Sequence, residues 1–201
     1  MKTALLVHGW ATKSEYYDLK YPSGSNSHWF PWLSKQLIVK NIHAVALEMP
    51  NGYYPQYEIW KKELERFDIN QETILIGHSC GAGFLIRWLS ENDTKVGRVV
   101  LVAPWLGINP GDDFDESFFD FTIDSNIAQK TDGITVFNSS DDYESIQESV
   151  NSIREQVKDI KYVEFADKGH FTFKSLGTEE FPELMEEIIP TYYVKSREPI
   201  S

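Results

Sequence analysis

Residues 72–84, ETILIGHSCGAGF, determine how the rest of the chain is interpreted. The apolar run at 73–76 predicts a short buried strand, and the residues from Ala82 onward predict a helix. Between them, residues 77–81 read Gly-His-Ser-Cys-Gly, the G-x-S-x-G pattern of a serine at the tip of a sharp strand-to-helix turn. Glycines on either side of Ser79 omit Cβ atoms that would collide in such a turn. We therefore expect an exposed Ser79 hydroxyl beside a helix N-terminus, although an ordinary helix N-cap is the alternative.

Strands and helices alternate along the whole chain. Most of the predicted strands are continuous apolar runs, which is typical of a parallel sheet covered by helices on both faces. The predicted strands are Thr3 to Val7, His43 to Leu47, Thr73 to Ile76, Arg98 to Ala103, Ile134 to Phe137 and Lys161 to Phe165. The sequence therefore predicts an α/β fold, a three-layer α/β/α sandwich with a mostly parallel sheet of about six strands. We expect one domain over residues 1–201, because nothing in the sequence reads as a linker.

Composition and charge restrict the class of partner. The chain has 201 residues, and 31 acidic against 19 basic side chains give a net charge of −12. Such a surface repels nucleic acid and anionic bilayers, so neither is expected as a partner. A single cysteine, Cys80, allows no internal disulfide, and the N-terminal apolar run is too short for a signal peptide. We expect a cytoplasmic protein.

Two segments interrupt the alternation of strands and helices. Residues 11–28 are polar and rich in Ser, Gly, Tyr and Lys, and they predict a long loop. Residues 107–130 are acidic and aromatic, and they predict a small insertion that either covers a pocket as a lid or anchors itself to the body with its phenylalanines. Residues 191–201 predict a charged, frayed tail.

Candidate catalytic residues all follow predicted strands. In a parallel α/β sheet, ligands bind at the carboxyl ends of the strands. Ser79 follows the third strand, Asp141 and Asp142 follow the fifth, and His170 follows the sixth. A serine nucleophile needs a base within hydrogen-bond reach, and the base needs a carboxylate that orients it. We predict that Ser79, His170 and Asp142 form a catalytic triad, with Asp141 as the alternative acid.

An oxyanion hole would complete such a site. One donor is expected to be the backbone N–H of Cys80, the residue after the nucleophile, and the other that of Trp10, in the loop after the first strand. A rival hypothesis makes the Cys80 thiol the nucleophile with His78, but both side chains are expected to point into the core. The histidines and the cysteine do not have metal-ligand spacing, so we expect no catalytic metal.

Several segments occur in the order typical of small serine hydrolases of the α/β-hydrolase superfamily. They are LLVHGW, HWFPWLSKQL, LEMPN, ILIGHSCGA, VLVAPW, FFDF, NSSDD and KGHF. The sequence most resembles the compact group typified by retinoblastoma-binding-protein-type serine hydrolases and their bacterial relatives. The resemblance implies the α/β-hydrolase fold with a minimal cap or none, a Ser79–Asp142–His170 triad, no cofactor and carboxylic-ester hydrolysis. The sequence departs from these relatives at Cys80, where leucine is usual, at Tyr143, where proline is frequent, and in a longer Tyr16 to Ser27 loop.

These features predict a serine hydrolase that cleaves a small-molecule ester or thioester through an acyl-enzyme. Two alternatives remain open at the level of sequence. One is a hydrolase-fold module that binds a protein partner through the acidic, aromatic residues 112–121. The other is an amidase or peptidase that uses the same triad.

Overall fold

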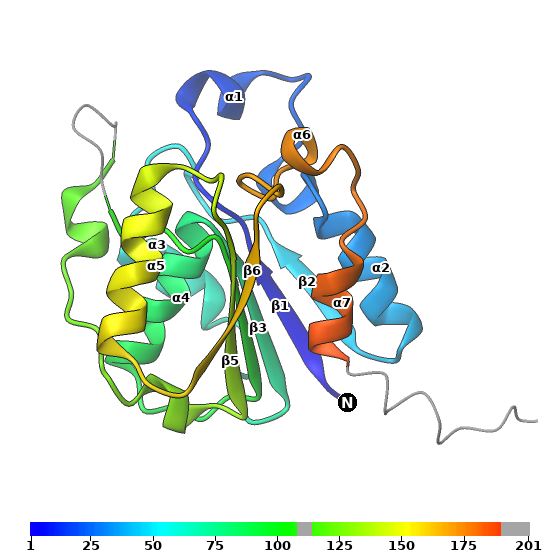
Figure 1. Ribbon diagram of the computed structural model, residues 1–201. Helices are drawn as coiled ribbons and strands as arrows, with labels where there is room; N and C mark the ends of the chain where they lie inside the picture. The colour runs from blue at the N-terminus through cyan, green and yellow to red at the C-terminus, as the bar shows by residue number, and fades with distance from the viewer. Residues whose placement is uncertain (108–113, 190–201) are drawn as a thin grey trace, which may run out of the picture.

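Six parallel strands form one sheet in the computed structural model, which describes residues 1–107 and 114–189 (Figure 1). The spatial order is β2-β1-β3-β4-β5-β6, and every neighbouring pair is parallel. The strands are β1 (Thr3–Val7), β2 (His43–Leu47), β3 (Thr73–His78), β4 (Arg98–Val102), β5 (Gly133–Ser139) and β6 (Ile160–Phe165). The predicted parallel α/β sheet is confirmed, and each strand end lies within two residues of its predicted position.

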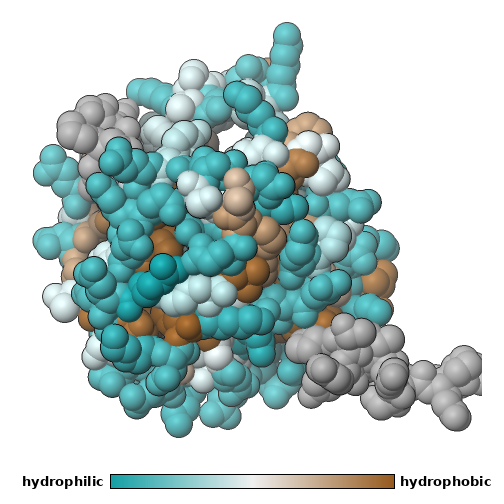
Figure 2. All heavy atoms as spheres, in the orientation of Figure 1, coloured by the Kyte–Doolittle hydropathy of each residue, from teal (hydrophilic) through white to brown (hydrophobic). Residues whose placement is uncertain are grey.

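Helices cover both faces of the sheet and complete the three-layer sandwich (Figure 1). Helices α2 (Phe30–Val39) and α7 (Pro182–Ile188) lie on one face, and α3 (Tyr57–Leu64), α4 (Cys80–Glu91) and α5 (Glu144–Gln156) lie on the other. Trp29, just before α2, forms an apolar stripe with Leu33 and Leu37 of the helix, and all three side chains are fully buried. Hydrophilic side chains cover much of the outer surface in the face that Figure 2 shows.

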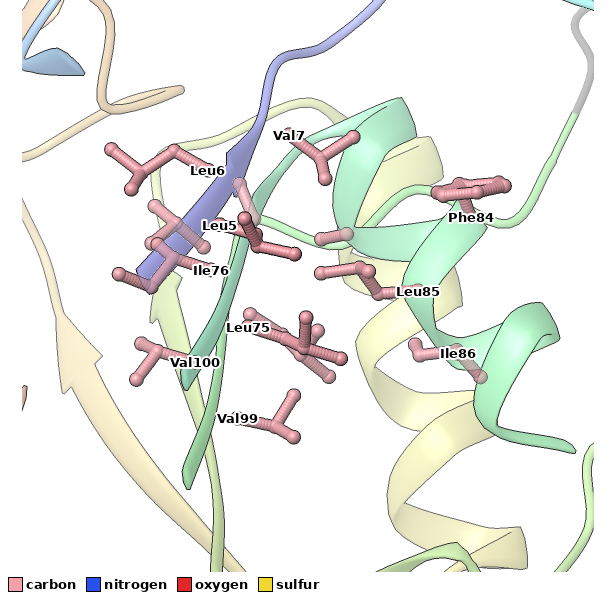
Figure 3. Packing of buried hydrophobic residues seen from close by; sticks show 14 of the residues in the cluster. Leu5, Leu6, Val7, Leu75, Ile76, Phe84, Leu85, Ile86, Val99 and Val100 are labelled. Atoms are coloured by element: carbon pink, nitrogen blue, oxygen red, sulfur yellow. The ribbon is translucent and has the colours of Figure 1, made fainter. Parts of the chain in front are cut away.

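The core is built from alternating side chains of the central strands. Successive side chains of a strand point to opposite faces of its sheet. Figure 3 shows Leu5, Leu75 and Val99 on the face covered by α4, and Leu6, Ile76 and Val100 on the opposite face. All six are fully buried. Because both faces need apolar side chains, these strands read as continuous apolar runs in the sequence.

The segment at 11–28 contains more structure than the predicted loop. It holds α1 (Lys13–Tyr17) and the 3-10 turn η1 (Gly24–Asn26). A capping box begins α1, because the Thr12 hydroxyl accepts the Glu15 N–H at 3.2 Å and the Glu15 carboxylate accepts the Thr12 N–H at 3.0 Å. The loop prediction was therefore partly wrong, and none of the helical residues is buried, which is why no apolar periodicity revealed them.

The described part of the 107–130 insertion is packed against the body. It contains the 3-10 turns η2 (Glu116–Phe119) and η3 (Ile127–Lys130). The Phe118 ring is fully buried against Trp60, with their centroids 5.2 Å apart, and Phe114 packs edge-on against Trp105. These rings anchor the described part of the insertion to the body. The rest of this insertion (108–113) and the predicted tail at 191–201 lie outside the described residues.

A buried carboxylate joins α7 to the end of the sheet at which the strands begin, opposite their carboxyl ends. Glu187 accepts hydrogen bonds from Arg98 at 2.7 Å, Lys161 at 2.5 Å and the Thr135 hydroxyl at 2.8 Å. These three residues belong to β4, β6 and β5, so one side chain holds the last helix on three neighbouring strands.

The carboxyl ends of the strands carry the loops that position the site. In Figure 1 they point to the top of the molecule, where α1 and the short α6 (Phe173–Leu176) also lie. β2 lies on one side of β1, and β3 to β6 follow on the other side, so the order of the strands reverses between β1 and β3. Ligands of α/β proteins bind at such a switch point. Among the described residues, no helix is long and apolar enough to cross a membrane.

Candidate active site

Ser79 occupies a strained turn between β3 and α4. Its backbone angles, φ 55° and ψ −122°, lie in a region that non-glycine residues rarely adopt and that costs about 1–3 kcal/mol. The surrounding hydrogen bonds hold it there. The Ser79 N–H donates to the Val102 carbonyl at 2.9 Å, and the Ser79 carbonyl accepts the Trp105 N–H at 3.1 Å. The Ser79 side chain makes no capping hydrogen bond to α4, so the N-cap alternative is not supported.

The two flanking glycines are required by close backbone contacts. A Cβ atom at Gly77 would lie 2.6 Å from the Ala82 Cα, and one at Gly81 would lie 2.4 Å from the carbonyl oxygens of Val7 and His8. Both contacts are with backbone atoms, which cannot move aside locally. The collision expected from the sequence is thus the reason for glycine at both positions.

The structure brings Ser79, His170 and Asp142 into one hydrogen-bonded chain. His170 Nε2 lies 2.9 Å from the Ser79 Oγ, and His170 Nδ1 lies 2.9 Å from each Asp142 carboxylate oxygen. The Asp142 side chain is fully buried. In this arrangement the Asp142 carboxylate accepts a hydrogen bond from Nδ1–H, which leaves Nε2 free to accept the proton of Ser79.

Asp141, the alternative acid, has a different position. Its Oδ1 accepts the Ser139 hydroxyl at 2.5 Å and the Gly169 N–H at 2.9 Å. The hydrogen bond from Ser139 holds the pKa of the Asp141 carboxyl below its usual value. Asp141 therefore joins the loop after β5 to the loop that carries His170, without a hydrogen bond to the His170 ring.

His78 contributes a contact that the sequence did not indicate. Its side chain is buried, as expected, but its Nε2–H donates to the His170 carbonyl at 2.8 Å. Burial lowers the pKa of His78 well below its ordinary value, so the ring is neutral. The residue before the nucleophile thus fixes the backbone of the candidate base.

His28 joins the 11–28 segment to the same group of histidines. Its ring centroid lies 5.6 Å from that of His78, and its Nδ1 accepts the Phe173 N–H at 3.2 Å. Burial lowers the pKa of His28 to about 4. Only the three-dimensional fold brings His28 close to His78, and no spacing in the sequence relates the two residues.

The two expected oxyanion donors lie next to Ser79. Cys80 is the first residue of α4, and a Cβ atom at Gly9, the neighbour of Trp10, would lie 3.5 Å from the Ser79 Oγ. Within residues 1–107 and 114–189, neither the Trp10 N–H nor the Cys80 N–H takes part in a backbone hydrogen bond. Both N–H groups therefore have no backbone acceptor among the described residues.

A buried histidine fixes the orientation of the Trp10 N–H. His8 Nε2 accepts the Met49 N–H at 2.9 Å, so Nδ1 carries the proton and donates to the Gly9 carbonyl at 2.7 Å. That carbonyl and the Trp10 N–H belong to one planar peptide group, so a bond to one fixes the direction of the other. Burial lowers the pKa of His8, which keeps the ring in this neutral form.

The Cys80 thiol is not suited to act as a nucleophile. It is fully buried, and burial raises its pKa well above the ordinary value. A thiol in that state carries no thiolate near neutral pH. In the part of the chain that the structure describes, no group of three or more His, Cys, Asp or Glu side chains could hold a metal ion.

A parallel α/β sheet with a serine on a strained turn after its third strand, and a histidine and an aspartate after later strands, defines the α/β-hydrolase class. Residues 4–188 match the model of the serine hydrolase family. The chain therefore belongs to this family, which confirms the predicted fold and superfamily.

Relatives extend the similarity over nearly the whole chain. The Bacillus subtilis (strain 168) protein named "Putative hydrolase YdeN" is 29% identical over 199 residues, which cover 92% of this chain and 98% of that protein. The crystal structure of the B. subtilis ydeN gene product superimposes with a TM-score of 0.78 at 24% identity, covering 97% of this chain and all of that one. The monoacylglycerol lipase of Paleococcus ferrophilus has a TM-score of 0.61 at 16% identity, over 92% and 91% of the two chains. The two structures show a shared fold.

Proposed function

We propose that this serine hydrolase cleaves carboxylic esters or thioesters through an acyl-enzyme on Ser79. The observation that supports this most is the continuous chain of contacts from the Ser79 Oγ through His170 to Asp142, each at 2.9 Å. A hydroxyl is a poor nucleophile at neutral pH, and this chain supplies the base and the orienting carboxylate that it needs.

Acylation begins with attack of the Ser79 Oγ on the substrate carbonyl carbon. The hydroxyl proton passes to His170 Nε2, and the new imidazolium is stabilised by the Asp142 carboxylate at Nδ1. The tetrahedral intermediate then collapses, the bond from carbon to the leaving oxygen or sulfur breaks, and His170 returns the proton to the leaving group. The products of this step are the free alcohol or thiol and an ester on Ser79.

The negative charge of the intermediate is the main electrostatic demand of the reaction. The Trp10 and Cys80 N–H groups would stabilise it, and each such donor typically contributes about 3 kcal/mol. The Cys80 N–H also lies at the N-terminus of α4, where the helix dipole favours negative charge. Because backbone groups provide both donors, an unusual residue such as Cys80 is compatible with this role.

Deacylation repeats the chemistry with water in place of serine. His170 removes a proton from water, the hydroxide attacks the acyl carbon, and the same N–H groups hold the second intermediate. The bond to the Ser79 Oγ breaks, and His170 gives that oxygen its proton. The acid product leaves, and the enzyme returns to its starting state.

A panel of aryl and alkyl esters with increasing acyl length tests this proposal. Wild type should hydrolyse part of the panel, and Ser79→Ala should reduce kcat/KM by at least about a thousandfold, since loss of the nucleophile removes the covalent route. Ser152→Ala, on α5, is a matched control that should leave activity unchanged. Equal activity of Ser79→Ala and wild type would exclude the proposed mechanism.

The same panel distinguishes the alternatives. Aminoacyl arylamides added to it would identify an amidase or peptidase, which must protonate a poorer leaving group with the same His170. The protein-binding alternative depends on the acidic, aromatic residues at 112–121, of which 112 and 113 lie outside the described residues. Among the described aromatic side chains, Phe118 is fully buried and Phe114 nearly so. These rings pack inward, and therefore we favour the esterase.

A further inference from the structure

Tyr143 combines high exposure with direct contact to the candidate base. Tyr143 is 69% exposed, whereas tyrosine is of intermediate burial on average in folded proteins. Its ring centroid lies 5.3 Å from that of His170, at an interplanar angle of 57°. One part of the ring therefore touches the His170 imidazole, and the remainder is open to anything bound beside it.

The backbone at Tyr143 is held firmly. Its N–H donates to Asp142 Oδ1 at 2.7 Å, and its carbonyl accepts the N–H groups of Ile146 and Gln147, the first hydrogen bonds of α5. The ring is thus attached to a fixed point between the triad carboxylate and a helix. A rigidly placed aromatic ring loses little entropy when a ligand packs on it.

The chemistry of acylation defines which part of a substrate can reach this ring. His170 must give its proton to the leaving oxygen, so the leaving group has to lie beside the His170 ring. Tyr143 borders that ring and is accessible. We propose that Tyr143 forms a leaving-group subsite that favours esters of aryl or other flat, apolar alcohols.

Other exposed apolar side chains also lie in segments that come after the carboxyl ends of the strands. Most of the large apolar side chains that are exposed in the described residues belong to the segments that follow β1, β2, β5 and β6. They are Tyr16, Tyr17, Leu19, Tyr21, Tyr54, Tyr143 and Phe173. Apolar side chains that collect on one surface commonly mark a binding site. This distribution fits a substrate whose apolar part packs on an open aromatic rim.

The test rests on the proposed function and uses esters that share one acyl group. An aryl acetate and an alkyl acetate are chosen so that their alcohols leave equally well, as judged by their rates of hydroxide-catalysed hydrolysis. Both give the same acetyl-enzyme, so deacylation is identical and kcat/KM reports the leaving-group side alone. The variants are Tyr143→Ala and Tyr143→Phe, and both retain the N–H that donates to Asp142.

We expect Tyr143→Ala to lower the ratio of aryl to alkyl kcat/KM about threefold to tenfold, the range expected for loss of one aromatic pair. Tyr143→Phe should keep the wild-type ratio, because the ring remains. A small fluorophosphonate should label both variants at the wild-type rate, which shows that Ser79 and His170 are undisturbed.

Two results would overturn the inference. In one, Tyr143→Ala leaves the ratio unchanged, and in the other it lowers both substrates equally, as expected if Tyr143 only supports His170. Failure of the proposed function is a separate outcome, because it would appear as hydrolysis of both acetates by Ser79→Ala.

Discussion

Replacing Asp142 with asparagine tests whether a buried carboxylate stabilises the His170 cation. Both carboxylate oxygens lie 2.9 Å from His170 Nδ1, and the Asp142 side chain has no exposure to water. Opposite unit charges at that distance attract by about 6 kcal/mol at an effective dielectric constant of about 20. Loss of that attraction in the transition state corresponds to a decrease in kcat of about 10⁴-fold.

The tautomer of His170 adds to the effect. An asparagine amide can donate to Nδ1, which would place the His170 proton on Nε2. A protonated Nε2 cannot accept the proton of Ser79. The Asp142→Asn variant should therefore be nearly inactive while it folds normally, because asparagine has nearly the shape of aspartate. The assay is the steady-state hydrolysis of an aryl ester, with circular dichroism and a urea unfolding curve as the check on folding.

Asp141→Asn is the matched control, since the neighbouring carboxylate contacts Ser139 and Gly169 instead of the His170 ring. We expect it to reduce kcat by less than about tenfold. Because the pKa of Asp141 is lowered in the folded state, its contribution to stability is present above pH 4 and disappears as the pH falls further. Comparable losses of activity in the two variants, or an Asp142→Asn enzyme within tenfold of wild type, would refute the reasoning.

Three further predictions concern the supports of the site and the fold. His78→Leu should reduce kcat about tenfold to a hundredfold with little change in KM, because the His170 carbonyl loses its donor at 2.8 Å, and initial-rate kinetics would show this; an unchanged kcat would contradict the positioning role. Acidification from pH 6.5 towards pH 4 should destabilise the protein, because the pKa of His28 is about 4 when folded and about 6.5 when unfolded, so the unfolded state binds the proton first. For this side chain, the free energy of unfolding changes by at most about 1.4 kcal/mol per pH unit. Urea unfolding curves recorded at several pH values should show a smaller change per pH unit for His28→Gln than for wild type. Glu187→Ala should lower the free energy of unfolding by about 1–3 kcal/mol without affecting kcat, because the cations on two strands lose a shared, buried partner far from Ser79; a loss of activity at full stability would be inconsistent with a purely structural brace.

The strands were predictable because burial on both faces leaves a strong signal. A run such as residues 99–102, VVLV, contains no polar break, and only a central parallel strand needs apolar residues at every position. Helix α1 was not predictable in the same way, because it buries no residue and so has no apolar stripe. Its capping box, Thr12 to Glu15, was the remaining signal, and that pattern also occurs in loops.

The candidate site was predictable at the residues that chemistry constrains. Ser79 and His170 follow strands of one sheet, and topology alone brings such strand ends together. The choice between Asp141 and Asp142 required the structure, because adjacent residues in a loop point in different directions that spacing does not reveal. The role of His78 depends on its contact with His170, which is 92 positions away in the sequence. The role of Tyr143 depends on its exposure in the folded protein. Neither property can be read from the neighbouring residues in the sequence.

Covalent labelling shows directly whether Ser79 is the nucleophile. A fluorophosphonate probe transfers its phosphonyl group to an activated serine oxygen and releases fluoride, and peptide mass spectrometry locates the adduct. We expect one adduct, on the peptide that contains Ser79. This adduct should be absent in Ser79→Ala, and its formation should be strongly slowed in Asp142→Asn. Labelling at another residue, or equal labelling of Ser79→Ala and wild type, would contradict this role of Ser79.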